Sequence, residues 1–411
     1  MLLFEAIRIA ADNLARHKLR TCLTMLGIIF GVAAVLSMLS IGAGAEKEAL
    51  SVIQKMGLRN IIVEAKDFEK EELEILRQDS PGLSRLDLEA LNKALPPEAL
   101  VVGKRDLRTY QIVSAQGKSD SRVWGVGALF PLTTSLEILE GAFFLPFEEV
   151  KAYQVCVLGR TARRKLFGVS PALGKQIKIN QEWFAVVGVL ADQLIEQEEF
   201  EGIKVANPNN EIYIPLQTLL TKFEMDPVED ELDEIIVRVP EHLSIQEQAS
   251  LISSMVGSMH RNIDDFSLVV PERLLQQHRQ TQRIFNIVMG AIASISLLVG
   301  GIGIMNIMLA SVLERTSEIG LRRALGARQR DVSRQFVLEA ITISLAGALL
   351  GISLGYGISQ LVAAYSGWPT IVTPLSIALG VGVSCTVGLI FGIYPARQAA
   401  RVSPIEALRY E

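Results

Sequence analysis

One short segment, residues 314–331, combines charged, apolar and small residues at helical spacing. Glu318 lies one turn from Arg322, where opposite charges stabilise a helix, and Ile319 belongs to a modest apolar side. Gly326 stands where a helix-ending glycine is expected, with two arginines in the last turn before it. A loop that was only solvated would need no apolar residues, so the pattern predicts a short capped helix that fits the groove of a partner protein.

Motifs for catalysis or metal binding are absent from the sequence. The nearest approach to a nucleotide-binding loop, residues 168–176, has the wrong glycine spacing and no Ser or Thr after Lys175. There is no GxSxG or HExxH motif, the four histidines are scattered, and the three cysteines have spacings that exclude a disulfide framework or a CxxC metal pair. We therefore expect no catalytic residue, no metal and no cofactor in this chain.

Four apolar segments are long enough to cross a membrane. The chain is 49% hydrophobic and carries no charge over residues 21–45, 284–313 and 340–396, whereas a spanning helix needs about 20 apolar residues. The last run is too long for one helix, and the segment from Tyr365 to Pro374 divides it. We predict transmembrane helices at residues 21–43, 284–312, 336–364 and 375–396.

The distribution of Lys and Arg sets the expected orientation. Basic residues cluster before the first helix, between the second and third, and after the fourth, whereas the loop between the third and fourth has no charge. Because basic loops stay in the cytoplasm, we expect a multi-pass protein of the cell (inner) membrane with both termini and the 314–334 loop cytoplasmic. Residues 45–281 would then lie outside, with 26 Lys+Arg against 37 Asp+Glu, a net charge of −11.

Strand and helix patterns alternate within this expected outer domain. Residues 234–270 read as a β-α-β unit, and the segment after residue 58 has a similar pattern. Asn180 and Gln181 separate two alternating segments, which predicts a hairpin. The charged segment 67–79 is expected to be a mobile surface loop.

The fold class that follows is an α-helical membrane domain of four transmembrane helices plus an extracytoplasmic α+β domain on a helical stalk. In that α+β domain a β-α-β subdomain contains an inserted strand-rich subdomain. The expected segments are an amphipathic N-terminal segment at 1–20, an extracytoplasmic domain at 45–281 (β-α-β at about 58–125 and 228–270, insert at about 126–227, stalk helix at 271–283), and a cytoplasmic tail at 397–411.

Small residues recur at four-residue spacing in the apolar segments, which permits close approach of helix backbones. The spacing fits packing within one chain and dimerisation equally well. Because the helix cores lack charge, a polar translocation path is hard to build, which argues against a secondary transporter. The glycines are Gly27, Gly31, Gly347, Gly351, Gly355, Gly388 and Gly392.

Several stretches form motifs that are specific in combination. They are residues 19–32, 306–308 with 314–327, 392–400 and 404–411, together with 173–177 and 186–189. With these motifs the chain resembles the MacB/FtsX-type permeases of ABC transporters. One departure is that the macrolide exporter carries a fused ATPase, whereas this chain starts directly with the permease.

The resemblance implies a non-catalytic permease subunit that works with a separate cytoplasmic ABC ATPase, which binds the ATP and Mg. It implies a second permease copy, with a homodimer expected, a periplasmic adaptor (membrane-fusion protein), membrane lipid and no nucleic acid as partners. ATP-driven motion would move the outer domain and drive efflux or export of a drug, peptide or lipid-like substrate. The implied ATPase-coupling residues are Glu314, Arg315, Glu318, Ile319, Gly320, Arg322, Leu325, Gly326 and Ala327.

Three other functions are compatible with the same helices. The chain could regulate a cell-envelope hydrolase, which needs only a protein-binding surface outside the membrane, or it could be a lipoprotein-release permease. It could also be a receptor without energy coupling, in which case scrambling residues 314–331 would be harmless.

Overall fold

The computed structural model describes residues 18–134, 136–192, 199–200, 203–204, 207–366 and 369–407. The chain divides into two compact units. Met1–Glu48 and His278–Glu411 form what we call the helical unit, and Ala49–Gln277 form the sheet unit. Most of the expected N-terminal segment 1–20 lies outside the described residues.

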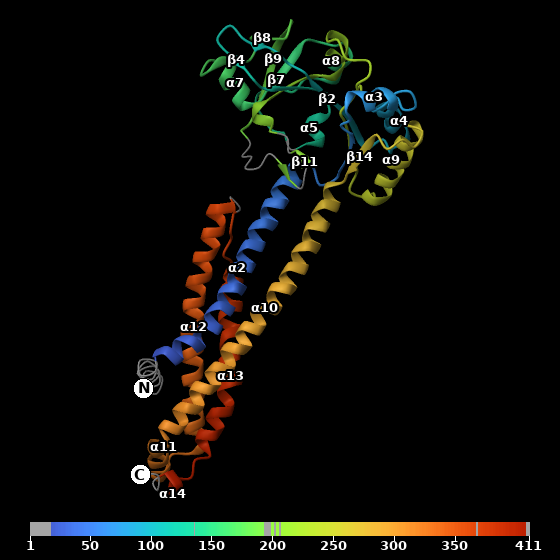
Figure 1. Ribbon diagram of the computed structural model, residues 1–411. Coiled ribbons are helices and arrows are strands. Elements are labelled where there is room, and N and C mark those ends of the chain that lie inside the picture. Colours follow the sequence, from blue (N-terminus) through green and yellow to red (C-terminus); the bar gives the residue numbers. More distant parts are fainter. Residues whose placement is uncertain are drawn as a thin grey trace. The chain divides into compact units, whose positions relative to one another are not determined.

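Long helices build the helical unit (Figure 1). Among the described residues, α2, α10, α12 and α13 are long and apolar enough to cross a membrane. α12 ends at Ser366 and α13 begins at Pro374, so the break falls in the expected segment. The depth of each helix in a membrane stays a prediction. The helices are α2 (Lys18–Met56), α10 (Pro271–Glu314), α11 (Thr316–Ala324), α12 (Gln329–Ser366), α13 (Pro374–Ala400) and α14 (Pro404–Ala407).

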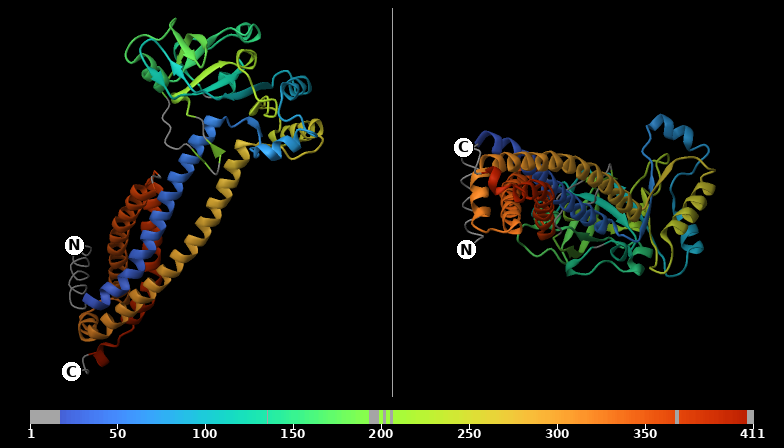
Figure 2. Two further views of the ribbon diagram at one scale, coloured as in Figure 1. Left: turned by 45° about the horizontal axis from the view of Figure 1, so that its top comes forward. Right: turned by 90° about the horizontal axis from the view of Figure 1, so that it is seen from below.

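Glycines lie where these helices approach one another, and α12 and α13 run side by side (Figure 2). A Cβ atom added at Gly351 would lie 2.8 Å from the carbonyl oxygen of Ile29 in α2. A Cβ at Gly388 in α13 would lie 2.1 Å from Ser344 Oγ in α12. The Ser384 hydroxyl of α13 also donates a 2.8 Å hydrogen bond to the Ser344 carbonyl. Helix packing in this unit therefore depends on backbones that nearly touch.

The other five glycines of the pattern also lie close to a neighbouring helix of the same chain. Those of α2 face α10, those of α12 face α2, and the second one of α13 faces α12. Contact with a second copy of the chain at these positions stays a prediction. The five are Gly27, Gly31, Gly347, Gly355 and Gly392.

The sheet unit contains one mixed sheet, in the order β14-β1-β13-β2-β5-β12-β7-β9-β8-β3-β4, with β6 paired to β9. A separate pair joins β10 (Glu199–Phe200) and β11 (Ile203–Lys204). The strands of the sheet are β1 (Asn60–Ala65), β2 (Leu100–Leu107), β3 (Ile112–Val113), β4 (Lys118–Ser119), β5 (Arg122–Val126), β6 (Ile138–Gly141), β7 (Val155–Leu158), β8 (Gln176–Ile179), β9 (Glu182–Leu190), β12 (Glu211–Pro215), β13 (Glu234–Arg238) and β14 (Phe266–Val269).

The first and last segments of the sheet unit meet in the sheet. β1 pairs antiparallel with both β13 and β14, so the strands near residue 60 and after residue 234 lie side by side in the sheet. β2 pairs with β13 on one side and with β5 on the other, so the strand-rich middle segment continues the same sheet. This mixed sheet with helices on it confirms the expected α+β class. The helices are α3 (Lys70–Leu76), α4 (Arg85–Ala94), α5 (Phe130–Thr133), α6 (Pro146–Val150), α7 (Arg160–Phe167), α8 (Leu216–Lys222) and α9 (Ile245–Met259).

Local patterns explain two of these elements. The predicted hairpin is confirmed, because β8 and β9 pair antiparallel around Asn180, whose φ is 52°. The prediction of a mobile loop over 67–79 was wrong, because this segment contains the helix α3. Arg77, which follows α3, places Nη2 2.7 Å from Asp230 Oδ2, and both side chains are largely buried. A charged pattern in sequence does not show that one of its charges is paired inside the fold.

A buried charge cluster surrounds His260 at the end of α9. Nδ1 of His260 lies 2.7 Å from Asp265 Oδ1, and Nε2 lies 3.5 Å from Asp87 Oδ1. Ser80 Oγ donates to Asp265 Oδ2 over 2.5 Å, and Arg77 Nη1 lies 3.8 Å from the same oxygen. Burial lowers the pKa of His260, but hydrogen bonds with Asp87 and Asp265 outweigh it and raise the pKa above its ordinary value. The cluster joins α4 and α9 to the loop before β14.

Candidate functional site

The candidate site is α11, the short helix between α10 and α12. α10 ends at Glu314, and Arg315 has non-helical backbone angles, φ −108° and ψ 19°, so the chain turns there before α11 begins. At the other end, Gly326 has a φ of 101°, a conformation that favours glycine and ends the helix. The expected capped helix is therefore present, with a turn at each end.

One face of α11 packs against the C-terminal part of the chain. Ile319 is 4% exposed, and a Cβ added at Gly320 would lie 2.3 Å from Ala407 Cβ in α14. Nη1 of Arg323 donates to the carbonyl oxygen of Val402, in the segment between α13 and α14. Figure 1 shows α11 and α14 at the same end of the helical unit. The glycine is needed because α14 approaches the helix too closely for a side chain.

The opposite face of α11 is open. Leu321 is 53% exposed, Leu325 is 81% exposed, and the Glu318 side chain is 59% exposed. Arg322 Nη1 donates to Gln335 Oε1 of α12 over 3.0 Å. The exposed face thus offers two leucines beside a carboxylate, and the buried face prevents the helix from turning over. Such a surface suits docking of another protein.

The expected coupling residues separate into three groups. Ile319 and Gly320 are buried beneath α11, and Arg315 and Ala327 are partly buried at its two turns. The exposed group is Glu314, Glu318, Arg322, Leu325 and Gly326.

Arg315 reaches from the turn to α12. Its Nη1 lies 3.5 Å from Glu339 Oε2, its Nε lies 3.4 Å from Glu318 Oε2, and its guanidinium carbon lies 5.8 Å from the centre of the Phe336 ring. Glu339 is 2% exposed, inside a helix for which we predicted an uncharged core. Sequence analysis missed Glu339. The available signal was one carboxylate among apolar residues beside a basic segment.

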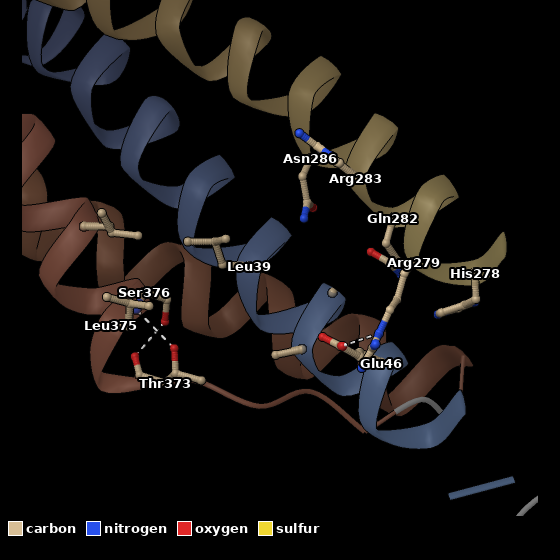
Figure 3. Close-up of a pocket in the computed structure, with 13 residues that line it drawn as sticks. Leu39, Glu46, His278, Arg279, Gln282, Arg283, Asn286, Thr373, Leu375 and Ser376 are labelled. Atoms are coloured by element: carbon tan, nitrogen blue, oxygen red, sulfur yellow. Dashed lines mark hydrogen bonds and ion pairs between the residues drawn. The ribbon is translucent and has the colours of Figure 1, made fainter. Parts of the chain in front are cut away.

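A groove of about 460 Å³ lies elsewhere in the helical unit, between α2, α10 and the start of α13. Glu46 of α2 and Arg279 of α10 face each other there, with Arg279 Nε 3.3 Å from Glu46 Oε1 (Figure 3). Leu39 and Leu375 supply apolar lining. Among the described residues, no group of three or more His, Cys, Asp or Glu side chains could hold a metal ion.

Two family models match different parts of the chain. Residues 21–254 match the family described as MacB-like periplasmic core domain, and residues 290–404 match the FtsX-like permease C-terminal family. The chain is 31% identical to the "Uncharacterized ABC transporter permease YknZ" of Bacillus subtilis, over 100% of both chains. It is 33% identical to the "Macrolide export ATP-binding/permease protein MacB" of Bdellovibrio bacteriovorus, over 100% of this chain and 62% of that one.

The chain spans about three fifths of the length of the MacB relatives. Among solved structures, it is similar to the periplasmic region of MacB from Actinobacillus actinomycetemcomitans, with a TM-score of 0.44 and 17% identity over 55% of this chain and 94% of that one.

The helices and the matches define a class, the membrane permeases of ABC transporters. Within that class the chain belongs to the MacB/FtsX-type family, and its relatives include proteins named for export.

Proposed function

We propose that this permease couples ATP hydrolysis by a separate cytoplasmic ATPase to movement of its outer domain, and that the movement drives export. The observation that carries the proposal is the two-sided packing of α11. Its buried face is held by α14 through Gly320 and Ala407, while Leu321 and Leu325 stay exposed. A helix held in this way can receive a force from a docked protein and pass it to the helices on either side.

The expected topology agrees with this proposal. We propose that α11 and both termini lie in the cytoplasm, which the positive-inside rule supports because basic residues flank the helices on the α11 side. The ATP and Mg would bind to the ATPase, and this chain would be non-catalytic. α2 continues as helix to Met56 and α10 begins at Pro271, and we propose that these extensions form the helical stalk.

The relatives favour export among the possible outputs. Their names include macrolide, syringafactin and pyoverdine export proteins. The described parts of the spanning helices contain few charged groups apart from their ends, so a polar path through this unit has little support. We propose that substrates are handled on the outer side of the membrane, by a homodimer of this chain.

A surface on the sheet unit would suit an adaptor protein. Phe147 and Val150 of α6 are 52% and 78% exposed, and Tyr153 packs edge-on against Phe147 with ring centres 6.1 Å apart. Trp183 in β9 is 51% exposed, and the neighbouring Glu182 accepts a 2.6 Å hydrogen bond from Gln154. Exposed aromatic residues of this kind are typical of protein interfaces.

Charge reversal on α11 tests the coupling role. Glu318→Arg should reduce recovery of an ABC ATPase with the tagged chain and abolish permease-dependent ATP hydrolysis, without loss of folded protein. Glu89→Arg is the matched control, because Glu89 is 61% exposed on a helix of the sheet unit and pairs with Lys93 one turn away. Normal hydrolysis in the Glu318 variant, or equal loss in both, would contradict the proposal.

A further inference from the structure

The turn between α10 and α11 is fixed by charge as well as by backbone. Arg315 is the residue at the turn, and its side chain is only 14% exposed. It lies between two carboxylates of different exposure, Glu318 at 59% and Glu339 at 3% of the side chain. The guanidinium therefore connects a carboxylate on the open face of α11 with one buried in α12.

Burial makes the inner contact hard to give up. A carboxylate removed from water is destabilised unless a positive charge or hydrogen bonds compensate it, and breaking a buried pair costs more than breaking an exposed one. If Arg315 moved with α11, Glu339 would lose a compensating charge. We therefore expect α11 and α12 to move together as long as Arg315 remains paired with Glu339. The two helices should separate when Arg315 moves away from Glu339.

The contacts of α12 give such a movement a route into the rest of the helical unit. Phe336, one turn before Glu339, is 1% exposed and packs in the core of the unit. Further along α12, Gly351 and Gly355 lie against α2, and the Ser37 hydroxyl of α2 donates a 3.0 Å hydrogen bond to the Gly355 carbonyl. Because α12 is closely packed against its neighbours, a shift of α12 near Glu339 should also displace the helices that it contacts.

We propose that Glu339 is a positioning residue that holds Arg315. When a protein binds the exposed face of α11 at Glu318, Arg315 transmits the resulting force to α12. The inference rests on the proposed function, because it requires an ATPase seated on α11. A protein bound at Glu318 changes how Arg315 is shared between its two carboxylates. That change alters the contact between α11 and α12 and so transmits ATPase movement to the bundle.

The test uses the full chain with the ATPase that co-purifies with it, reconstituted in nanodiscs. Glu339→Gln keeps the shape of the side chain and removes its charge. Permease-dependent ATP hydrolysis should fall about tenfold, within the range usual for coupling between sites, while the amount of ATPase recovered stays the same. Ser353→Ala is the control, because Ser353 is an exposed polar residue of the same helix whose hydroxyl donates a 3.0 Å hydrogen bond to the Leu349 carbonyl within α12. It should remain coupled.

A double-mutant cycle distinguishes transmission through the Arg315–Glu339 pair from a role of these residues in stability alone. If Arg315 and Glu339 act as a pair, Arg315→Gln with Glu339→Gln should be no worse than either single change. The exchanged pair, Arg315→Glu with Glu339→Arg, should recover much of the coupling if it folds. Additive losses in the cycle would overturn the proposal. A lower melting temperature with normal hydrolysis per assembled complex would also overturn it.

These results are distinct from failure of the proposed function itself. If the wild-type chain recovers no ATPase, or if ATP hydrolysis does not depend on the permease, the coupling function is wrong and this role of Glu339 is wrong with it. If the wild type couples and Glu339→Gln couples equally well, only transmission through the Arg315–Glu339 pair is wrong.

Discussion

The two units of this protein are stabilised in different ways. In the sheet unit, large side chains such as Tyr213, Phe184 and Leu166 fill apolar cores, and charged clusters around Arg105 and His260 are paired within the fold. In the helical unit, glycines bring backbones within contact distance, and the ion pairs found among the described residues involve Glu46, Arg279 and the turn before α11.

This difference shows where each unit can change shape. We expect the sheet unit to keep its shape when it moves, because densely packed cores leave few alternative arrangements. In the helical unit, closely packed helices transmit displacement, and its buried charge pair lies at the turn where a partner is expected to dock. Changes in the two units should therefore differ in size and in what they affect.

The largest effect is expected where backbones touch. Gly351→Leu should cost about 3 kcal/mol or prevent folding, because a side chain would overlap the Ile29 carbonyl and Val32 of α2. Thermal unfolding in detergent and size-exclusion chromatography measure this. Gly357→Leu, in the same helix, is the control, because nothing lies within 4 Å of a Cβ added there. Equal melting temperatures and elution profiles for the two variants would contradict a role for close backbone packing at Gly351.

A smaller effect is expected at the buried histidine of the sheet unit. His260→Gln should cost about 2 kcal/mol, because the buried carboxylates of Asp87 and Asp265 lose the positive charge of His260. Fluorescence of Trp124 and Trp183 reports unfolding of this unit in a Trp368→Phe background. His242→Gln is the control, because His242 is 63% exposed beside an exposed Glu98. A loss of the same size in the control would contradict this role.

The same residue predicts a pH dependence. The pKa of His260 is raised in the folded protein, so its stabilising contribution is complete below about 6.5, the ordinary histidine value. The contribution is lost as the pH rises through the raised pKa. The melting temperature of the sheet unit should fall over that range in wild type. This fall should be smaller in His260→Gln but not absent, because burial raises the pKa of Glu64 to about 7 and ionisation of that carboxyl group also lowers stability as the pH rises. Parallel curves for the two proteins would show that His260 does not cause it.

The smallest effect is expected in the β8–β9 turn. Asn180 Oδ1 accepts from the Tyr110 amide over 3.1 Å, and Asn180 Nδ2 donates to the Arg108 carbonyl over 3.2 Å. Asn180→Ala loses these bonds, together with a 3.4 Å bond from the Gln111 amide, and places alanine at a positive φ, which should cost about 1 kcal/mol. Asn180→Gly loses the bonds but tolerates the backbone, so its loss measured by denaturant unfolding should be smaller. A larger loss in the glycine variant would contradict this explanation.

The sequence was sufficient for features that depend on local pattern. The absence of charge located the long helices, and glycine spacing marked where they pack. Gly326 marked the end of α11, and Asn180 marked the hairpin turn. These features follow from a few neighbouring residues, because apolar runs, helix ends and tight turns have local physical causes.

Long-range contacts could not be predicted in this way. The approach of Ala407 to Gly320, and of Glu339 to Arg315, depends on how α12, α13 and α14 return to α11. Likewise, segment 67–79 was predicted to be a loop because charge runs are usually solvated, and the sequence does not show that Arg77 pairs with Asp230, far along the chain. A charged residue in sequence gives no sign of whether its partner is water or a distant carboxylate.

Site-specific photocrosslinking in cells tests most directly whether α11 seats an ATPase. A photoreactive residue at Leu325, which is 81% exposed directly after α11, should give an adduct that contains an ABC ATPase, identified by mass spectrometry. The same residue at Val169, which is 97% exposed in the sheet unit, should give no such adduct. No ATPase adduct from Leu325, or one from Val169, would contradict the proposed coupling site and topology.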